Sequence, residues 1–298
     1  DFTIGSFVAA NSTVTLVGDS DANINGYTFY NLTISKDDAA ATITAAGNIS
    51  VGGTLTFTRG SLDMASHELT LGSNLSLPTG TQLSFADGTF TAGSHDISVN
   101  GGNLTLAGTS TLSTTGSFTI SGTGSVSHGS GAFSVGDMSL TDTANFTQTG
   151  DNGAGFNQEL SSLSVGTGTI ATWDADSDGG SLSIVGDVNV QGILAFNQKN
   201  VQIGGSLSGN IEIYDLYIPA DWTLTPAEGT TLTVRRSILI EATGFYNSTY
   251  GPSLMWGGPN SVTGGSFNDA NTSAVNMGNL VISGNYDKTL ASHLAAGS

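Results

Sequence analysis

Short runs of alternating apolar and polar residues recur along this chain, and each run ends at or beside a glycine. Clear examples are N-I-S-V-G-G (48–53), E-L-T-L-G-S (68–73), D-I-S-V-N-G-G (96–102), S-F-T-I-S-G (117–122) and S-L-S-I-V-G (181–186). Alternation over a few residues with glycine at the boundary is typical of a strand with one buried side, not of a helix. The pattern therefore predicts many short β-strands.

These runs repeat roughly every twenty residues, which is a spacing typical of solenoid repeats. A short strand cannot bury its apolar side alone, so repeated strands must stack into one continuous core. The predicted fold is all-β, a parallel β-helix or β-solenoid. Its inward-facing residues should include Leu32, Ile34, Leu163, Val165, Leu280 and Ile282.

The pattern becomes less regular after residue 210. Four of the five prolines fall between residues 211 and 260, and proline is confined to sheet edges, strand starts and turns because it cannot donate a ladder hydrogen bond. We therefore divide the chain into a solenoid body, residues 1–210, and a less regular continuation, residues 211–298. Residues 244–260 are expected to form a loop that leaves the solenoid.

Large aromatic residues gather in the same part of the chain. They are Tyr214, Tyr217, Trp222, Tyr246, Tyr250 and Trp256. Aromatic side chains anchor interfaces, and they also offer faces on which sugars stack. Three roles stay open for this region: an assembly contact, a cap over the last coil, or a ligand groove.

Charge and composition narrow the class of partner. The chain has 298 residues, with 24 acidic against 6 basic side chains, a net charge of −18 and no cysteine. Nucleic-acid binding needs several cationic contacts with phosphates, and docking on anionic membranes needs basic segments. No apolar run is long enough to span a bilayer. We expect neither a nucleic-acid partner nor membrane insertion, and no disulfide or thiolate metal site.

The sharpest local motif is D-A-D-S-D-G-G at residues 174–180. Asp174, Asp176 and Asp178 resemble the first three ligand positions of an EF-hand-type loop, and calcium accepts such flexible oxygen cages. The twelfth position of that loop falls on Val185, so further ligands would have to come from a neighbouring coil. A structural Ca²⁺ site and a solvated acidic turn are both consistent with the motif.

A weaker version of this motif lies near the N-terminus. Asp19, Asp21 and Asn23 also stand at alternate positions, but Asp and Asn dominate ordinary turns as well. A turn is the favoured interpretation here. Calcium is the only cofactor that the sequence suggests.

Two further patterns involve histidine and threonine. His67 and His95 share an S-H-[ED] phrase, and with His128 they would form a ladder for a metal or protons if the coils brought them together. Exposed turn histidines are the simpler interpretation. An ice-binding surface would need threonine rows at a fixed coil position. The row 54–58 contains three threonines, and Thr111 begins a second weak row, but no fixed position is evident, so ice binding is not favoured.

Eight N-x-S/T sequons are candidate glycosylation sites. Their asparagines are Asn11, Asn31, Asn48, Asn74, Asn103, Asn145, Asn247 and Asn271. The signal is weak, because Ser and Thr are abundant throughout the chain.

Enzymatic activity is not expected. Polysaccharide hydrolases need convergent carboxylates, and lyases of the pectate-lyase kind need a cation near calcium. The six basic residues are scattered along the chain. Arg235 and Arg236 adjoin, but strand alternation would point them to opposite faces.

A resemblance supports a structural role. The runs F-Y-N-L-T-I-S (29–35), G-N-I-S-V-G-G-T-L-T-F (47–57) and G-S-L-D-M-A-S-H-E-L-T-L-G (60–72) resemble repeats of large secreted bacterial surface proteins, of the filamentous-haemagglutinin and autotransporter-passenger kind. The resemblance covers about residues 25 to 210 and again 277 to 284. It implies a right-handed parallel β-helix used for display, adhesion or fibre building.

We therefore expect an extracellular, cell-surface structural protein. The chain begins at Asp1, as a processed secreted protein or a fragment would. Copies should join end to end, by strand addition between residues 1–10 and 280–290, and host or matrix glycans are candidate further partners. The alternative is a carbohydrate-binding or carbohydrate-cleaving β-helix that uses the aromatic region.

Overall fold

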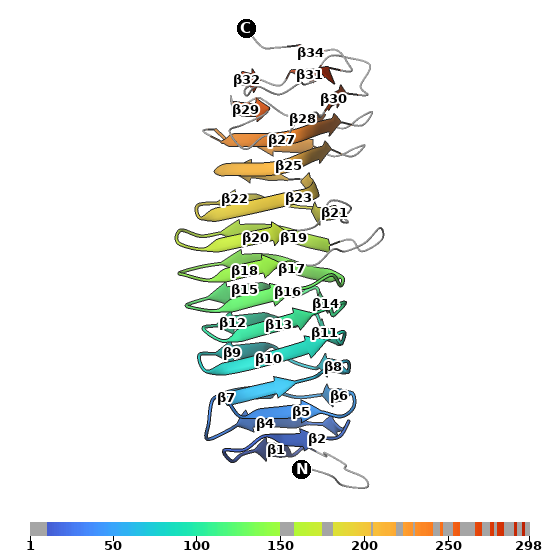
Figure 1. Ribbon diagram of the computed structural model, residues 1–298, viewed down its shortest axis with the longest axis vertical. Coiled ribbons are helices and arrows are strands. Elements are labelled where there is room, and N and C mark those ends of the chain that lie inside the picture. Colours follow the sequence, from blue (N-terminus) through green and yellow to red (C-terminus); the bar gives the residue numbers. More distant parts are fainter. Residues whose placement is uncertain are drawn as a thin grey trace.

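The computed structural model is a column of short parallel strands (Figure 1). It describes residues 11–149, 158–174, 181–203, 205–218, 223–228, 230–240, 245–246, 253–256, 266–269, 275–276, 279–282, 289–290 and 294–295. These residues form strands and turns and no helix. In particular, no helix there is long and apolar enough to cross a membrane. The predicted all-β solenoid is confirmed.

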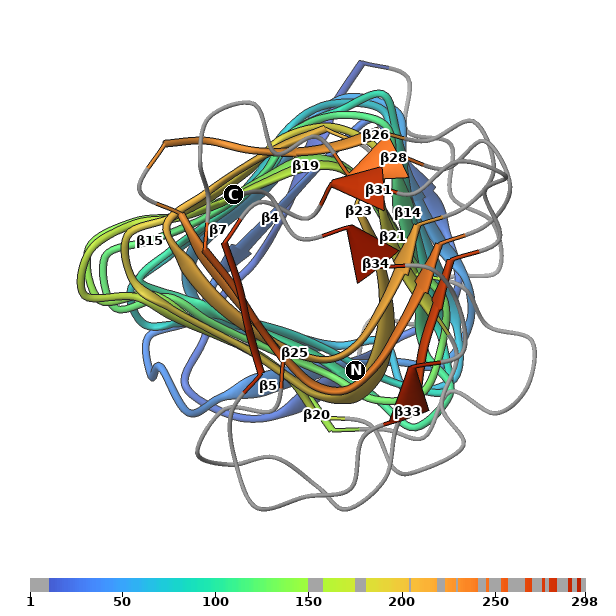
Figure 2. The same cartoon turned by 90° about the horizontal axis from the view of Figure 1, so that it is seen from above.

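The strands make three faces around a common interior, as the view along the column shows (Figure 2). The chain passes from face 1 to face 2 to face 3 and then returns to face 1 one layer further along, and we call one such passage a coil. Inside the stack, a strand such as β10 pairs in parallel with the strand one coil before it and the strand one coil after it. Strands β7, β17, β19, β23, β25 and β27 are longer and turn a corner, so that they belong to two faces.

The strands of each face follow from these pairings. Face 1 contains β1 (Thr13–Leu16), β4 (Asn31–Ser35), the start of β7 (Leu55–Asp63), β9 (Leu75–Pro78), β12 (Ile97–Asn100), β15 (Phe118–Ser121), the ends of β17 (Phe133–Leu140) and β19 (Gln158–Val165), β22 (Val188–Val190), β24 (Ser206–Ser208), β26 (Thr223–Pro226) and β28 (Phe245–Tyr246).

Face 2 contains β2 (Ala22–Ile24), β5 (Thr42–Ala45), the end of β7, β10 (Thr81–Ala86), β13 (Asn103–Ala107), β16 (Ser125–His128), β18 (Asn145–Gln148), β20 (Ile170–Asp174), the starts of β23 (Ile193–Ile203), β25 (Asn210–Ile218) and β27 (Thr231–Ile240), β29 (Ser253–Trp256) and β32 (Asn279–Ile282).

Face 3 contains β3 (Thr28–Phe29), β6 (Ile49–Val51), β8 (Glu68–Leu71), β11 (Thr89–Gly93), β14 (Thr111–Thr114), the starts of β17 and β19, β21 (Ser181–Ile184), the ends of β23, β25 and β27, β30 (Ser266–Asp269) and β33 (Thr289–Leu290). A separate pair joins β31 (Val275–Asn276) to β34 (Leu294–Ala295).

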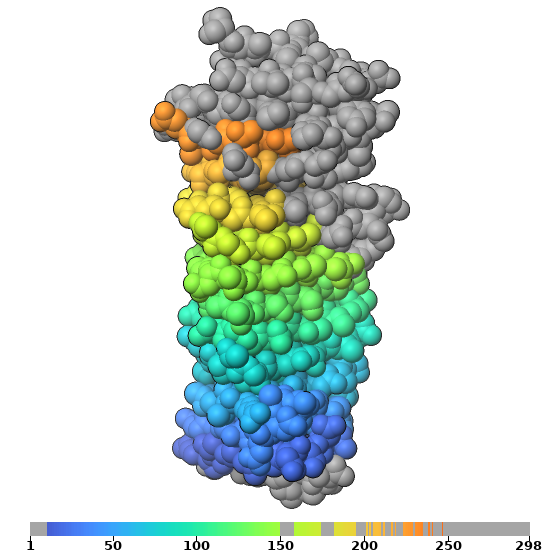
Figure 3. All heavy atoms as spheres, turned by 60° about the vertical axis from the view of Figure 1, so that its left-hand side comes forward, coloured from blue at the N-terminus to red at the C-terminus, as the bar shows by residue number. Residues whose placement is uncertain are grey.

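Each coil occupies one layer of the column, and the successive colours of the space-filling view form bands across it (Figure 3). On face 2, Leu62, Leu83, Leu104, Val126 and Phe146 stand directly above one another, 20 to 22 residues apart. The repeat seen in the sequence is therefore the length of one coil.

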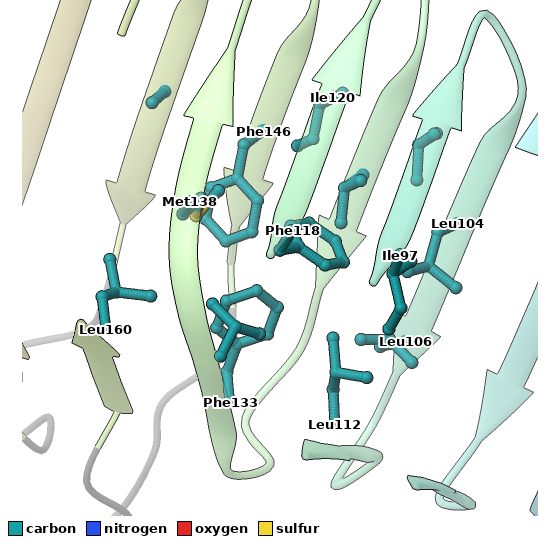
Figure 4. Packing of buried hydrophobic residues seen from close by; sticks show 14 of the residues in the cluster. Ile97, Leu104, Leu106, Leu112, Phe118, Ile120, Phe133, Met138, Phe146 and Leu160 are labelled. Carbon is teal, nitrogen blue, oxygen red and sulfur yellow. The ribbon is translucent and has the colours of Figure 1, made fainter. Parts of the chain in front are cut away.

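The core is a continuous apolar column inside the three faces. Leu32, Ile34, Leu163 and Val165 are all buried, which confirms their predicted inward orientation. Leu280 and Ile282 lie in β32, whose side chains are outside the described set. Figure 4 shows side chains from neighbouring strands meeting in the interior. Full burial of one such side chain contributes roughly 1.5–3 kcal/mol, and stacking repeats that contribution coil after coil.

The C-terminal continuation keeps the coil path in at least part of the segment expected to leave the body. Strands β28 and β29 lie within residues 244–260 and pair in parallel with β26 and β27. Pro226 is the last residue of β26 and is buried there, so this proline ends a strand without breaking the stack. The rest of residues 244–260 lies outside the described residues.

Candidate functional site

The principal calcium candidate begins at the end of a face 2 strand. Asp174 is the last residue of β20, and β21 begins at Ser181. Asp176 and Asp178 fall outside the described residues, so the calcium site remains a prediction. No group of three or more His, Cys, Asp or Glu side chains that could hold a metal ion occurs in the described part.

The members of the second candidate set have partners within the fold. The Asp21 carboxylate accepts the backbone N–H of Thr42, one coil later, at 2.9 Å. Asn23 lies in β2, where it pairs with Thr44. The Asp19 carboxylate accepts the hydroxyl of Ser20 at 2.9 Å. The Asp21 carboxylate therefore joins two successive coils, and calcium binding by this segment remains a prediction.

Of the six aromatic candidates, the structure describes the side chain of one, Tyr246. Tyr246 has no exposed surface and pairs with Leu224 on face 1; its burial raises the pKa of the phenol. A ring with no exposed surface cannot contact a partner, so Tyr246 is corrected from a contact residue to a core residue. Tyr214 and Tyr217 lie in β25 and Trp256 ends β29, with side chains outside the described set. Trp222 and Tyr250 are outside the described residues.

The three histidines do not form a ladder, which was the less favoured interpretation, because they lie on different faces of the solenoid. His67 directly precedes β8 on face 3, whereas His95 stands just before β12 on face 1. His128 ends β16 on face 2, is 1% exposed, and its ring lies 5.2 Å from that of Phe133. Two similar phrases in the sequence thus occupy different sides of the solenoid.

The described sequon asparagines occupy turns and corners, most of them at or just before the first residue of a strand. Asn48, Asn74, Asn103 and Asn145 are exposed there. Their amide oxygens are used within the fold. The Asn48 oxygen, for example, accepts the backbone N–H of Glu68 at 3.0 Å. Asn11 and Asn31 are also described, and Asn247 and Asn271 are not. Glycosylation at any of them remains a prediction.

A feature that sequence reasoning missed is a straight column of hydroxyl side chains along the middle of face 1. Its members pair coil by coil without interruption: Thr15, Thr33, Thr56, Ser76, Ser98, Thr119, Ser139 and Ser164, followed by Asn189 and Ser208. The T-x-T row at residues 54–58 is not repeated in the coils paired with it, where Thr33 and Ser76 stand beside Thr56. Hydroxyl side chains do recur at one position.

Variable coil length hides this column in the sequence. Thr15 and Thr33 are 18 residues apart, whereas Ser139 and Ser164 are 25 apart. The corners absorb the difference, because turns accept insertions that strands do not. Aligning the residues before and after each corner separately would have found the column.

A neighbouring column at the start of the face 1 strands has a different role, since its side chains bond to one another from coil to coil. The Asn31 amide donates to the Thr13 hydroxyl at 3.2 Å, and the Asn31 oxygen accepts the Thr54 backbone N–H at 2.8 Å. Further along, Asp96 accepts the Ser117 backbone N–H at 2.9 Å. This column ties successive coils together.

The middle column carries fewer such bonds. Within the described residues, the Ser139 hydroxyl donates to the Thr119 oxygen at 3.5 Å, and the Ser208 hydroxyl donates to the Asn189 amide oxygen at 3.1 Å. The other hydroxyls of the column point outward from half-buried or exposed positions. Face 1 therefore presents an orderly row of groups that can both donate and accept hydrogen bonds.

Comparison of this chain with protein-family models, with curated proteins and with solved structures found no match.

Proposed function

We propose that this chain is an extracellular structural protein whose copies join end to end in a cell-surface filament or adhesive layer. The observation that carries the proposal is the state of the first coil. Among the described residues, β1, β2 and β3 pair on one side only, with β4, β5 and β6. Unpaired strand edges are a ready template for another chain.

The core beneath those edges is also partly open. Val14 and Leu16, the inward residues of β1, are only partly buried, whereas Leu32 and Ile34, one coil later, have no exposed surface. Covering Val14 and Leu16 with the last coil of another copy would continue the same core. Because every strand of the stack is parallel, such an addition is head to tail and produces an open filament.

A pair of substitutions in β1 tests this joint. Val14→Lys places a charge on the inward side of the open coil, and Thr15→Lys places the same charge on the outward side of the same strand. We expect negative-stain images of the unmodified chain and of Thr15→Lys to show filaments, and those of Val14→Lys to show single short rods. Circular dichroism should give the same β-signal for all three proteins.

Two results would contradict the proposal. If the unmodified chain forms only isolated rods at high concentration, the proposal of end-to-end assembly is wrong. Filaments of Val14→Lys as abundant as those of Thr15→Lys would move the joint away from the first coil.

We propose calcium as a supporting ion, on the sequence of residues 174–180. Filaments would then weaken in chelator and recover in millimolar calcium. The double variant Asp176→Asn, Asp178→Asn should behave in calcium as the unmodified chain behaves in chelator. Filaments of equal abundance with and without chelator would contradict a role for calcium and favour a solvated turn at residues 174–180.

A further inference from the structure

Asparagine followed by glycine is a reactive pair in proteins, because it readily loses the side-chain amide of the asparagine. This chain contains three such pairs: Asn25-Gly26, Asn100-Gly101 and Asn152-Gly153. Glycine favours the reaction because, without a Cβ, its backbone nitrogen can approach the preceding side chain. The first two pairs lie at corners of the described stack, and the third lies outside the described residues.

The reaction joins atoms of the two neighbouring residues. The backbone nitrogen of the glycine attacks the side-chain carbonyl carbon of the asparagine and loses its proton, and the amide nitrogen leaves as ammonia. Water then adds to the cyclic imide and opens it to aspartate or isoaspartate. Because the glycine nitrogen is the attacking atom, its N–H must first be released from any hydrogen bond that holds it.

The Asn100-Gly101 pair is held by coils on both sides. The Gly101 N–H donates to the carbonyl oxygen of Ser121, in the next coil, at 3.0 Å. The Asn100 amide oxygen accepts the Ser121 hydroxyl at 3.4 Å, and Asn100 pairs with Pro78 one coil earlier. Reaction at Asn100 therefore requires breaking contacts with two neighbouring coils.

The Asn25-Gly26 pair is held more weakly. Gly26 is exposed, and no atom of the described residues accepts its N–H. The Asn25 amide nitrogen donates to the Tyr27 hydroxyl at 3.5 Å, which is long for a hydrogen bond. This corner joins β2 to β3, and among the described residues both strands pair on one side only. Ends of a structure open locally at low cost, so this corner can reach the geometry that the reaction needs.

We propose that Asn25 is a site of spontaneous deamidation, and that its conversion disables the first coil as a joint. The second part rests on the end-to-end assembly proposed above. Aspartate adds a negative charge to a chain whose net charge is already −18. Isoaspartate also adds one backbone atom between β2 and β3, which shifts the buried Phe29 of β3 and moves the edge offered to another copy out of register. Newly made chains therefore assemble, and aged chains do not.

Peptide mapping by mass spectrometry of the folded chain, held at mildly alkaline pH, tests the first part. We expect Asn25 to convert roughly tenfold faster than Asn100 or more, since a local opening that is easier by about 1.4 kcal/mol already changes a rate tenfold. The denatured chain is the reference, because both pairs have the same chemistry there and should convert at similar rates. Equal rates at the two sites of the folded chain would overturn the proposal.

Two glutamine variants test the consequence for assembly. Asn25→Gln keeps an amide, but its longer side chain would have to close a larger ring, which is slower, and Asn100→Gln is the matched control. Alanine at Gly26 is unsuitable, because its Cβ would meet the Asn48 carbonyl oxygen at 2.8 Å. After ageing, we expect Asn25→Gln to form as many filaments as fresh protein, and the unmodified chain and Asn100→Gln to form few. An equal loss in aged Asn25→Gln would overturn the link to the joint.

The two parts of the proposal fail separately. If fresh chains of every variant stay as single rods, the proposed assembly is wrong, whereas conversion of Asn25 is still measured from its peptides. Circular dichroism before and after ageing should give the same β-signal for all proteins. A fall in that signal that accompanies conversion of Asn25 would overturn a change confined to the first coil.

Discussion

Asparagine and aspartate side chains at the corners bond to the backbone of the next coil. The Asp87 carboxylate accepts the backbone N–H of Thr109 at 2.8 Å and its hydroxyl at 3.0 Å. Asp87 itself has a φ of 66°, a conformation that Asp and Asn tolerate better than most residues. Asp87 thus adopts the backbone conformation that the turn requires, and its carboxylate accepts a backbone N–H from the neighbouring coil.

This bond makes stability depend on pH in a known direction. The Thr109 backbone N–H and then its hydroxyl lower the pKa of Asp87 below its ordinary value of 3.8. A carboxyl whose pKa is lower in the folded state stabilises the fold fully above its unfolded pKa, and this contribution is lost as the pH falls through the folded pKa. The loss should therefore occur below pH 3.8.

We predict that Asp87→Asn lowers the unfolding midpoint at neutral pH and that the difference from the unmodified chain closes below pH 3.8. Asparagine tolerates the positive φ and still accepts a hydrogen bond, but it carries no charge to stabilise. Thermal unfolding followed at several pH values measures this. A difference that stays constant with pH would show that the Asp87 charge contributes nothing.

At the scale of the strand and its corner, close stacking of backbones sets which residues fit. A Cβ on Gly131, at the corner between β16 and β17, would meet the carbonyl oxygen of Ser110 in the coil below. A Cβ on Gly52, between β6 and β7, would find only the Phe29 carbonyl oxygen, at 3.9 Å. Gly131 therefore leaves no room for a side chain, whereas Gly52 has room for one.

This contrast gives a matched pair of substitutions. We predict that Gly131→Ala destabilises the protein by roughly 1–3 kcal/mol, because the neighbouring coil must shift to make room. Gly52→Ala should be near neutral or slightly stabilising, because alanine restricts the unfolded chain more than glycine does. Denaturant unfolding of the two variants compares them directly. Equal effects would mean that the spacing between coils is not fixed at Gly131.

Over the whole molecule, each coil contacts only its neighbours. The effect of a substitution on the free energy of unfolding should therefore depend only on its own coil and the adjacent coils. The rings of Phe133 and Phe146 lie 5.4 Å apart, whereas Phe29 belongs to β3 in the first coil of the described stack. In a solenoid, stability is approximately a sum of coil terms and nearest-neighbour terms. Side chains in contact within one coil or between neighbouring coils should couple, and side chains in distant coils should not.

Double substitutions test this locality. We predict that Phe133→Ala and Phe146→Ala deviate from additivity by about 0.5–3 kcal/mol, because the two rings share one contact. Phe29→Ala and Phe146→Ala should add to within about 0.5 kcal/mol. Free energies of unfolding from denaturant titrations give both values. Coupling of the distant pair as strong as that of the near pair would contradict a nearest-neighbour description.

The class of fold was open to prediction from sequence because it depends on local patterns. Alternation of apolar and polar residues sets which side of each strand is buried, and glycine marks the corners. Buried residues such as Leu32 and Val165 therefore lie where the pattern placed them. The repeat length was equally visible, since strands on the same face must return after each coil.

Only the tertiary structure decided which residues stand above one another. Coils of different length place similar phrases on different faces, as His67 and His95 show, and dissimilar phrases in one column, as on face 1. The local alternation of apolar and polar residues does not show which residues pair between coils. Insertions at the corners change the number of residues in a coil without changing which strands stack. The sequence by itself thus determined the strands and the core, and stacking determined the surfaces.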